Sequence, residues 1–211
     1  IAEQIRAITQ THDTELNFHI TGLPVAEDQF GYEMFVQMGI AAPLAGLAIF
    51  LLLWYFFRNL PLIIAPMIVA MATVLIIMAS LIGLGFTVHI MSSMIAIFLM
   101  PIAVVDSVHI MSEFADRYKP GQDVKKVIAT VMDHLFTPML FTSVTSTIGF
   151  LSLMLTPIPP VQIFGAFVGF GIMLAFLTTI VFVPAYISRM KPETLVKLQT
   201  SHHASHQQQS K

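Results

Sequence analysis

The chain has 211 residues, of which 56% are hydrophobic and only 10% are charged, and its formal net charge is −2. A soluble domain has about 25% charged residues, so the composition excludes an ordinary soluble protein and indicates an integral membrane protein. The charge balance offers no basic surface for nucleic acid. The absence of cysteine excludes disulfides, thiolate metal sites and a cysteine nucleophile.

The first 32 residues are polar and too few to form a domain of their own. Residues 14–21 alternate polar and apolar side chains, as a half-buried strand does, and Gly22-Leu23-Pro24 then ends that pattern. We therefore expect residues 1–32 to be the end of an extracytoplasmic domain, within a fragment of a longer protein.

Residues 33–188 contain five apolar stretches, each long enough to cross a bilayer, which requires about 20 residues. The sequence therefore predicts an all-α membrane protein with a bundle of five transmembrane helices. The predicted spans are Met34–Phe57, Leu62–Leu84, Ile90–Phe114, Leu135–Leu155 and Val161–Ile187.

Basic residues follow the first, third and fifth spans, whereas residues 85–89 and 156–160 contain no lysine or arginine. Cytoplasmic loops carry an excess of these residues, so we expect those three span ends to face the cytoplasm. The N-terminus of the fragment is then extracytoplasmic and its C-terminus cytoplasmic. The basic residues concerned are Arg58, Arg117, Lys119, Lys125, Lys126, Arg189, Lys191 and Lys197.

Two further segments lie on the predicted cytoplasmic side. Within residues 122–134, Val124, Val127, Ile128 and Val131 recur at helical spacing, which predicts an amphipathic helix at the membrane interface. The alternative is an extension of the fourth span. Residues 189–211 end in a tract rich in histidine and glutamine and are predicted to be a disordered tail.

Asp106 lies within the third span, where a charge near the bilayer centre costs roughly 2.5–3.5 kcal/mol on insertion scales. Such a group is usually protonated or paired inside a bundle. His109 lies three residues further on and shares its helical face, while Pro101 loosens the backbone before it. We predict a proton relay at Asp106 with a weaker contribution from His109. The alternative is a structural carboxyl that bonds to a neighbouring helix.

The fourth span is rich in hydroxyl side chains. Thr142, Ser146 and Gly149 share one face of it. Thr142 and Ser146 are therefore candidates for a weak relay facing Asp106, with close helix packing as the alternative. The hydroxyl residues are Thr137, Thr142, Ser143, Thr145, Ser146, Thr147 and Ser152.

Three glycines are candidates for close helix packing. Gly165 and Gly169 in the fifth span form a pair of small residues four apart, and Gly149 lies in the fourth span. Small residues at this spacing let two helix backbones approach closely.

The residues do not favour an enzyme. An intramembrane aspartyl protease needs two acids that share a proton, and only Asp106 lies deep in a span. No Gly-x-Ser-x-Gly motif and no phosphate-binding Gly-x-x-x-x-Gly-Lys-Ser/Thr loop occurs. We therefore expect neither an enzymatic activity nor a cofactor or bound metal, and any energy coupling must come from an ion gradient.

The order of these parts resembles one half of a resistance-nodulation-division (RND) permease, helices two to six, over about Thr21–Met190. The resemblance is strongest at Pro101-Ile102-Ala103-Val104-Val105-Asp106-Ser107-Val108-His109 in the third span. It also includes Phe141-Thr142-Ser143-Val144-Thr145-Ser146-Thr147-Ile148-Gly149-Phe150 in the fourth span. Within that superfamily the chain is most similar to the MMPL-type predicted exporters. In eukaryotic relatives the same five-helix unit is called a sterol-sensing domain.

The resemblance implies a transporter in a bacterial inner membrane that uses the proton motive force to export lipids or other hydrophobic molecules. It implies that Asp106 takes part in proton translocation, because this residue matches the position of the family's membrane acid. The chain departs from many relatives in having one acid there, in Val105-Asp106-Ser107. The implied partners are membrane lipids, a hydrophobic substrate, protons, the other half of the permease and further copies of the chain. The alternative is a regulatory module that binds lipid without transporting it.

Overall fold

The computed structural model describes residues 22–57, 60–86, 88 and 90–190. Five α-helices account for most of these residues, and a short 3₁₀ segment, η1, follows the fourth. Their bounds are α2 (Leu23–Phe57), α3 (Leu60–Gly83), α4 (Ile90–Arg117), α5 (Val124–Leu151), η1 (Ser152–Leu155) and α6 (Pro159–Ser188).

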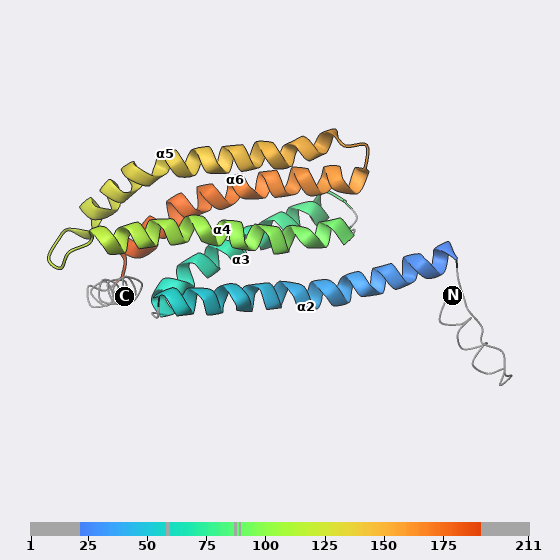
Figure 1. The fold of residues 1–211 in the computed structure, drawn as a ribbon, viewed down its shortest axis with the longest axis horizontal. Helices are drawn as coiled ribbons and strands as arrows, with labels where there is room; N and C mark the ends of the chain where they lie inside the picture. The colour runs from blue at the N-terminus through green and yellow to red at the C-terminus, as the bar shows by residue number, and fades with distance from the viewer. Residues whose placement is uncertain (1–21, 58–59, 87, 89, 191–211) are drawn as a thin grey trace, which may run out of the picture.

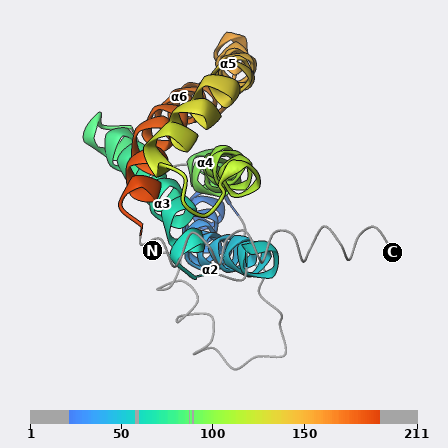
Figure 2. The ribbon, with the colours of Figure 1, turned by 90° about the vertical axis from the view of Figure 1, so that its left-hand side faces the viewer.

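The five helices run alternately in opposite directions along the long axis of the molecule (Figure 1). Viewed along that axis, α5 and α6 lie on one side of the bundle and α2 on the other, with α3 and α4 between them (Figure 2). Helix α4 contacts all four of the other α-helices, and α6 contacts α3, α4 and α5. Residues of α4 are thus placed where several helices meet.

The predicted all-α membrane bundle is confirmed. Helices α3, α4, α5 and α6 are each long and apolar enough to cross a bilayer, and α2 contains a shorter apolar segment at Gly39–Tyr55. Because backbone groups in hydrocarbon must be hydrogen-bonded within the protein, an apolar chain of this length is driven into helices.

Helix α2 begins at Leu23, well before the predicted start of the first span at Met34. Gly22 adopts a positive φ of 143°, and Pro24 occupies the first turn, where its missing N–H has no helical partner to lose. The turn residues expected to end a strand, Gly22-Leu23-Pro24, therefore lie at the start of a helix instead. The predicted strand at residues 14–21 lies outside the described residues.

Helix α5 joins two segments that the sequence analysis separates. Residues 124–151 form one continuous helix, so the separate amphipathic helix predicted at residues 122–134 is replaced by its alternative, an extension of the fourth span. Asp123 caps the helix by accepting a hydrogen bond from the Lys125 N–H at 3.0 Å. No glycine or proline interrupts the chain between this cap and Pro138, so no residue there breaks the helix.

The contact between α5 and α6 is close because glycines lie in it. A Cβ atom on Gly165 would lie 2.5 Å from the Phe150 carbonyl oxygen, and one on Gly169 would lie 3.1 Å from Leu151 Cγ. The Thr147 hydroxyl donates to the Gly169 carbonyl at 3.3 Å across the same contact. Gly149, by contrast, has open space where a Cβ atom would be, so no described residue packs against it there.

A hydrogen bond joins the C-terminal part of α6 to the start of α3. The Tyr186 hydroxyl donates to the Pro61 carbonyl at 2.7 Å. We expect Tyr186→Phe to lower the stability of the folded protein by about 1 kcal/mol, because the substitution removes this bond but keeps the ring stacked on Phe182. Thermal denaturation in detergent measures the change. Tyr32→Phe, at a side chain that is 73% exposed, is the control and should have no effect.

Candidate functional site

Asp106 lies inside the bundle. It is about 24 Å along α4 from that helix's first residue and about 17 Å from its last, at 1.5 Å per residue. Its side chain is only 8% exposed. Because a charged carboxylate at such depth is costly without partners, the groups around it decide what it can do.

The Asp106 carboxyl lies within hydrogen-bonding reach of the Ser143 hydroxyl in α5. Ser143 is itself buried, with 3% of its surface exposed. A hydroxyl donates one hydrogen bond and accepts others, so Ser143 can donate to a charged Asp106 or accept from a protonated one. The pair therefore accommodates both protonation states of the acid.

The hydroxyl that meets Asp106 is not one of the two that the sequence analysis selected. Thr142 is exposed, and its hydroxyl donates to the Pro138 carbonyl of its own helix at 3.0 Å. Ser146 is partly buried and forms no hydrogen bond to α4 among the described residues. The reason is the rotation of α5 about its axis, which turns Ser143 toward α4 and Thr142 outward.

Ser107, the next residue of α4, contacts a different helix. Its hydroxyl lies 3.4 Å from the Thr179 hydroxyl of α6 and 3.3 Å from the Ala103 carbonyl of its own helix. Both Ser107 and Thr179 are fully buried. Consecutive residues of α4 thus hold α5 and α6 through polar contacts at the same depth.

His109 is placed at the edge of this polar cluster. It interacts electrostatically with Asp106, as its position three residues further along the helix allows. Its side chain is nevertheless exposed on the surface of the part of the bundle that the structure describes. The structure therefore brings Asp106 and Ser143 together in the interior and leaves His109 outside.

Sequence reasoning missed Thr179 as a contact and Ser143 as the particular partner of Asp106. A detectable signal existed for Thr179, because it is one of few hydroxyl residues in a strongly apolar span. Thr73 in α3 has the same property and is also fully buried, and its hydroxyl has no hydrogen-bond partner among the described residues.

The contact with Ser143 predicts the effect of removing its hydroxyl. We expect Ser143→Ala to leave the fold intact but to change the pH at which Asp106 is half protonated, because the hydroxyl that interacts with the carboxyl is lost. Infrared difference spectroscopy of the carboxyl band during a pH titration measures this. Thr142→Ala, one position away on the same helix and exposed, is the matched control and should leave the titration unchanged.

The fold and the site define a multi-pass helical membrane protein with one acid deep in its central helix. Residues 36–189 match the family model described as Patched, Patched SSD, where SSD denotes the sterol-sensing domain. This match covers well over half of the chain, which therefore belongs to the Patched sterol-sensing-domain family. No curated protein matches the chain.

Proposed function

We propose that the chain is part of an RND-type transporter, of the MMPL-type exporter branch, that moves lipids or other hydrophobic molecules with energy from the proton gradient. The observation that carries this proposal is the burial of the Asp106 carboxyl in the bundle, in contact with a hydroxyl of a second helix. An acid kept at such depth is expensive, and intramembrane acids mark ion and proton pathways.

In this mechanism Asp106 alternates between its protonated and charged forms. A charged Asp106 favours a hydrogen bond donated by Ser143 of α5. A protonated Asp106 can instead donate a hydrogen bond to Ser143, or lose the bond and so release α5. Because Ser107 contacts Thr179, a movement of α4 at this level acts on α5 and α6 together. A change in charge at one residue thus becomes a rearrangement of three helices.

In this proposal, the positions of the basic residues determine how the helix bundle is oriented in the membrane. The end of α4, the start of α5 and the end of α6 lie at the same end of the bundle (Figure 1). They carry Arg117, Lys125, Lys126 and Arg189. That end is assigned to the cytoplasm of a bacterial cell, at the inner membrane. A second permease half and further copies of the chain would complete the transporter, and no enzymatic step is required.

A second candidate function is a sterol-sensing module that binds a lipid and regulates a partner without transporting anything. The match to the Patched sterol-sensing domain favours this candidate, because the family's description refers to sensing. The two candidates share one fold and differ in whether the bound lipid crosses the membrane against a gradient.

The full-length protein in proteoliposomes, with a fluorescent lipid and an imposed pH gradient, distinguishes the two. Transport predicts that the lipid changes leaflet or leaves the vesicle, and that this movement stops when a protonophore collapses the gradient. Binding that is unaffected by the protonophore, with no net movement of lipid, would contradict the transporter and support the sensing module.

A further inference from the structure

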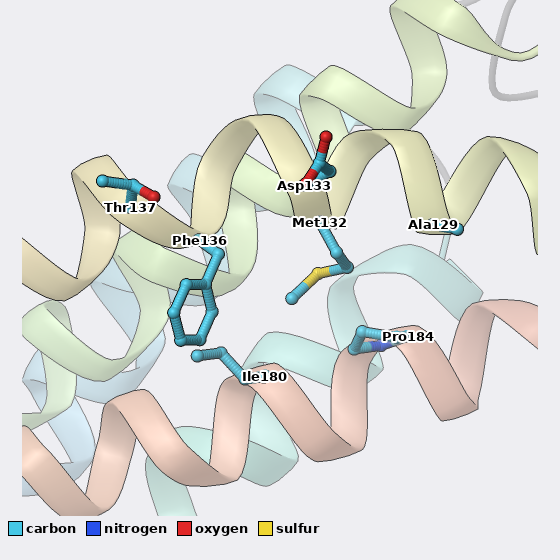
Figure 3. Close-up of a pocket in the computed structure, with 7 residues that line it drawn as sticks. All are labelled: Ala129, Met132, Asp133, Phe136, Thr137, Ile180 and Pro184. Atoms are coloured by element: carbon cyan, nitrogen blue, oxygen red, sulfur yellow. The ribbon is translucent and has the colours of Figure 1, made fainter.

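An apolar groove runs between α5 and α6 away from the Asp106 cluster. It is lined by Ala129, Met132, Phe136 and Thr137 of α5 and by Ile180 and Pro184 of α6, and its volume is about 570 Å³. Figure 3 shows the Met132 and Phe136 side chains pointing from α5 toward α6. The carboxylate of Asp133, which also lines the groove, is drawn on the side of α5 that faces away from α6 (Figure 3).

One end of this groove is basic. The positions of α5 that line it recur every three or four residues, and the same stripe reaches Lys125 and Lys126 one turn before Ala129. Both lysines are exposed. On α6, Arg189 follows the last helical turn, a little beyond Pro184 and at the same end of the bundle, and it too is exposed. The apolar groove thus leads to three cationic side chains.

The depth of these groups matches a membrane leaflet. Helix α5 has 28 residues, which corresponds to about 42 Å and exceeds the roughly 30 Å hydrocarbon core by about 12 Å. The first turn of α5, which carries both lysines, can therefore extend to the level of the lipid headgroups. The lining from Ala129 to Thr137 is then left at the level of the acyl chains.

From this arrangement we propose that the groove binds an anionic glycerophospholipid. One acyl chain lies against Met132, Phe136 and Ile180, and the phosphate is held by Lys125 and Lys126, with Arg189 close by. The choice of an anionic lipid rests on charge complementarity, because cationic side chains at the membrane surface attract anionic headgroups. This site is separate from Asp106 and does not depend on whether the protein transports its substrate.

The test uses the full-length protein in nanodiscs of phosphatidylcholine that contain phosphatidylglycerol as the minor component. Native mass spectrometry counts the lipid of each kind that stays bound. We expect phosphatidylglycerol to be enriched, and the double substitution Lys125→Gln, Lys126→Gln to weaken its retention roughly ten- to thirty-fold. Ala129→Trp, which fills the groove without changing any charge, should weaken retention as well.

The matched control is Arg117→Gln with Lys119→Gln, which removes the same charge at the same end of the bundle from residues that do not line the groove. An equal loss in this control would show a diffuse surface attraction and would overturn the site. Three other results would also overturn the proposed site. They are equal retention of phosphatidylcholine, displacement of the bound lipid by inorganic phosphate alone, and unchanged retention of phosphatidylglycerol in both Ala129→Trp and Ala129→Leu. Thermal denaturation of each variant establishes that it is folded.

Discussion

Asp106→Asn is expected to reduce proton-dependent transport by the full-length protein to the level seen without a gradient. Asparagine has nearly the same size and can still form a hydrogen bond with Ser143, but it cannot gain or lose a proton. We therefore expect the bundle to stay folded, with a change in stability within about 2 kcal/mol. Transport and proton uptake in proteoliposomes measure the effect.

Asp116→Asn is the matched control for this substitution. It removes a carboxylate from the same helix at an exposed position near the C-terminal end of α4. Transport should continue in the control, and its proton uptake should equal that of the original protein. If Asp106→Asn transports normally while the gradient is present and stops when the gradient is removed, Asp106 does not carry the coupling proton.

Gly165→Ala is expected to destabilise the bundle at the contact between α5 and α6. The added Cβ would lie 2.5 Å from the Phe150 carbonyl oxygen and 2.7 Å from the Leu153 Cβ atom. Neither atom belongs to the flexible end of a side chain, so α5 and α6 must separate. Overpacking of this kind costs about 1–3 kcal/mol, and a lower denaturation temperature in detergent measures it.

Gly149→Ala is the control for this effect, because a Cβ atom there would meet nothing within 4 Å. Alanine favours a helix over glycine by up to about 1 kcal/mol, so this variant should be at least as stable as the original chain. Equal behaviour of the two variants would show that the α5–α6 contact is not held at Gly165.

The extent of the helices was largely predictable from hydropathy. The predicted third span, Ile90–Phe114, corresponds to α4 at Ile90–Arg117, and the predicted fifth span, Val161–Ile187, to α6 at Pro159–Ser188. Helix α2 starts at Leu23 and α5 at Val124, each well before the start of its predicted span. Hydropathy marks where a chain enters hydrocarbon, and a helix can extend beyond that point into water.

The surroundings of Asp106 were predictable only in part. One acid in an apolar span indicates by itself that the residue has a role or a partner, because its cost in hydrocarbon is high. The identity of the partner depends on how α5 is rotated, and hydroxyl residues occur all around that helix, at 142, 143, 145, 146 and 147. Sequence spacing gave Thr142 and Ser146, whereas the structure places Ser143 at the acid.

The sequence by itself determined that this is a helical membrane protein with one buried acid, because apolar length and the cost of charge in lipid are properties of single segments. Only the tertiary structure decided which groups meet that acid and where the α5–α6 groove lies. Those features depend on the rotation and spacing of neighbouring helices. Both are set by contacts between residues far apart in the chain, such as Gly165 with Phe150 and Ser107 with Thr179.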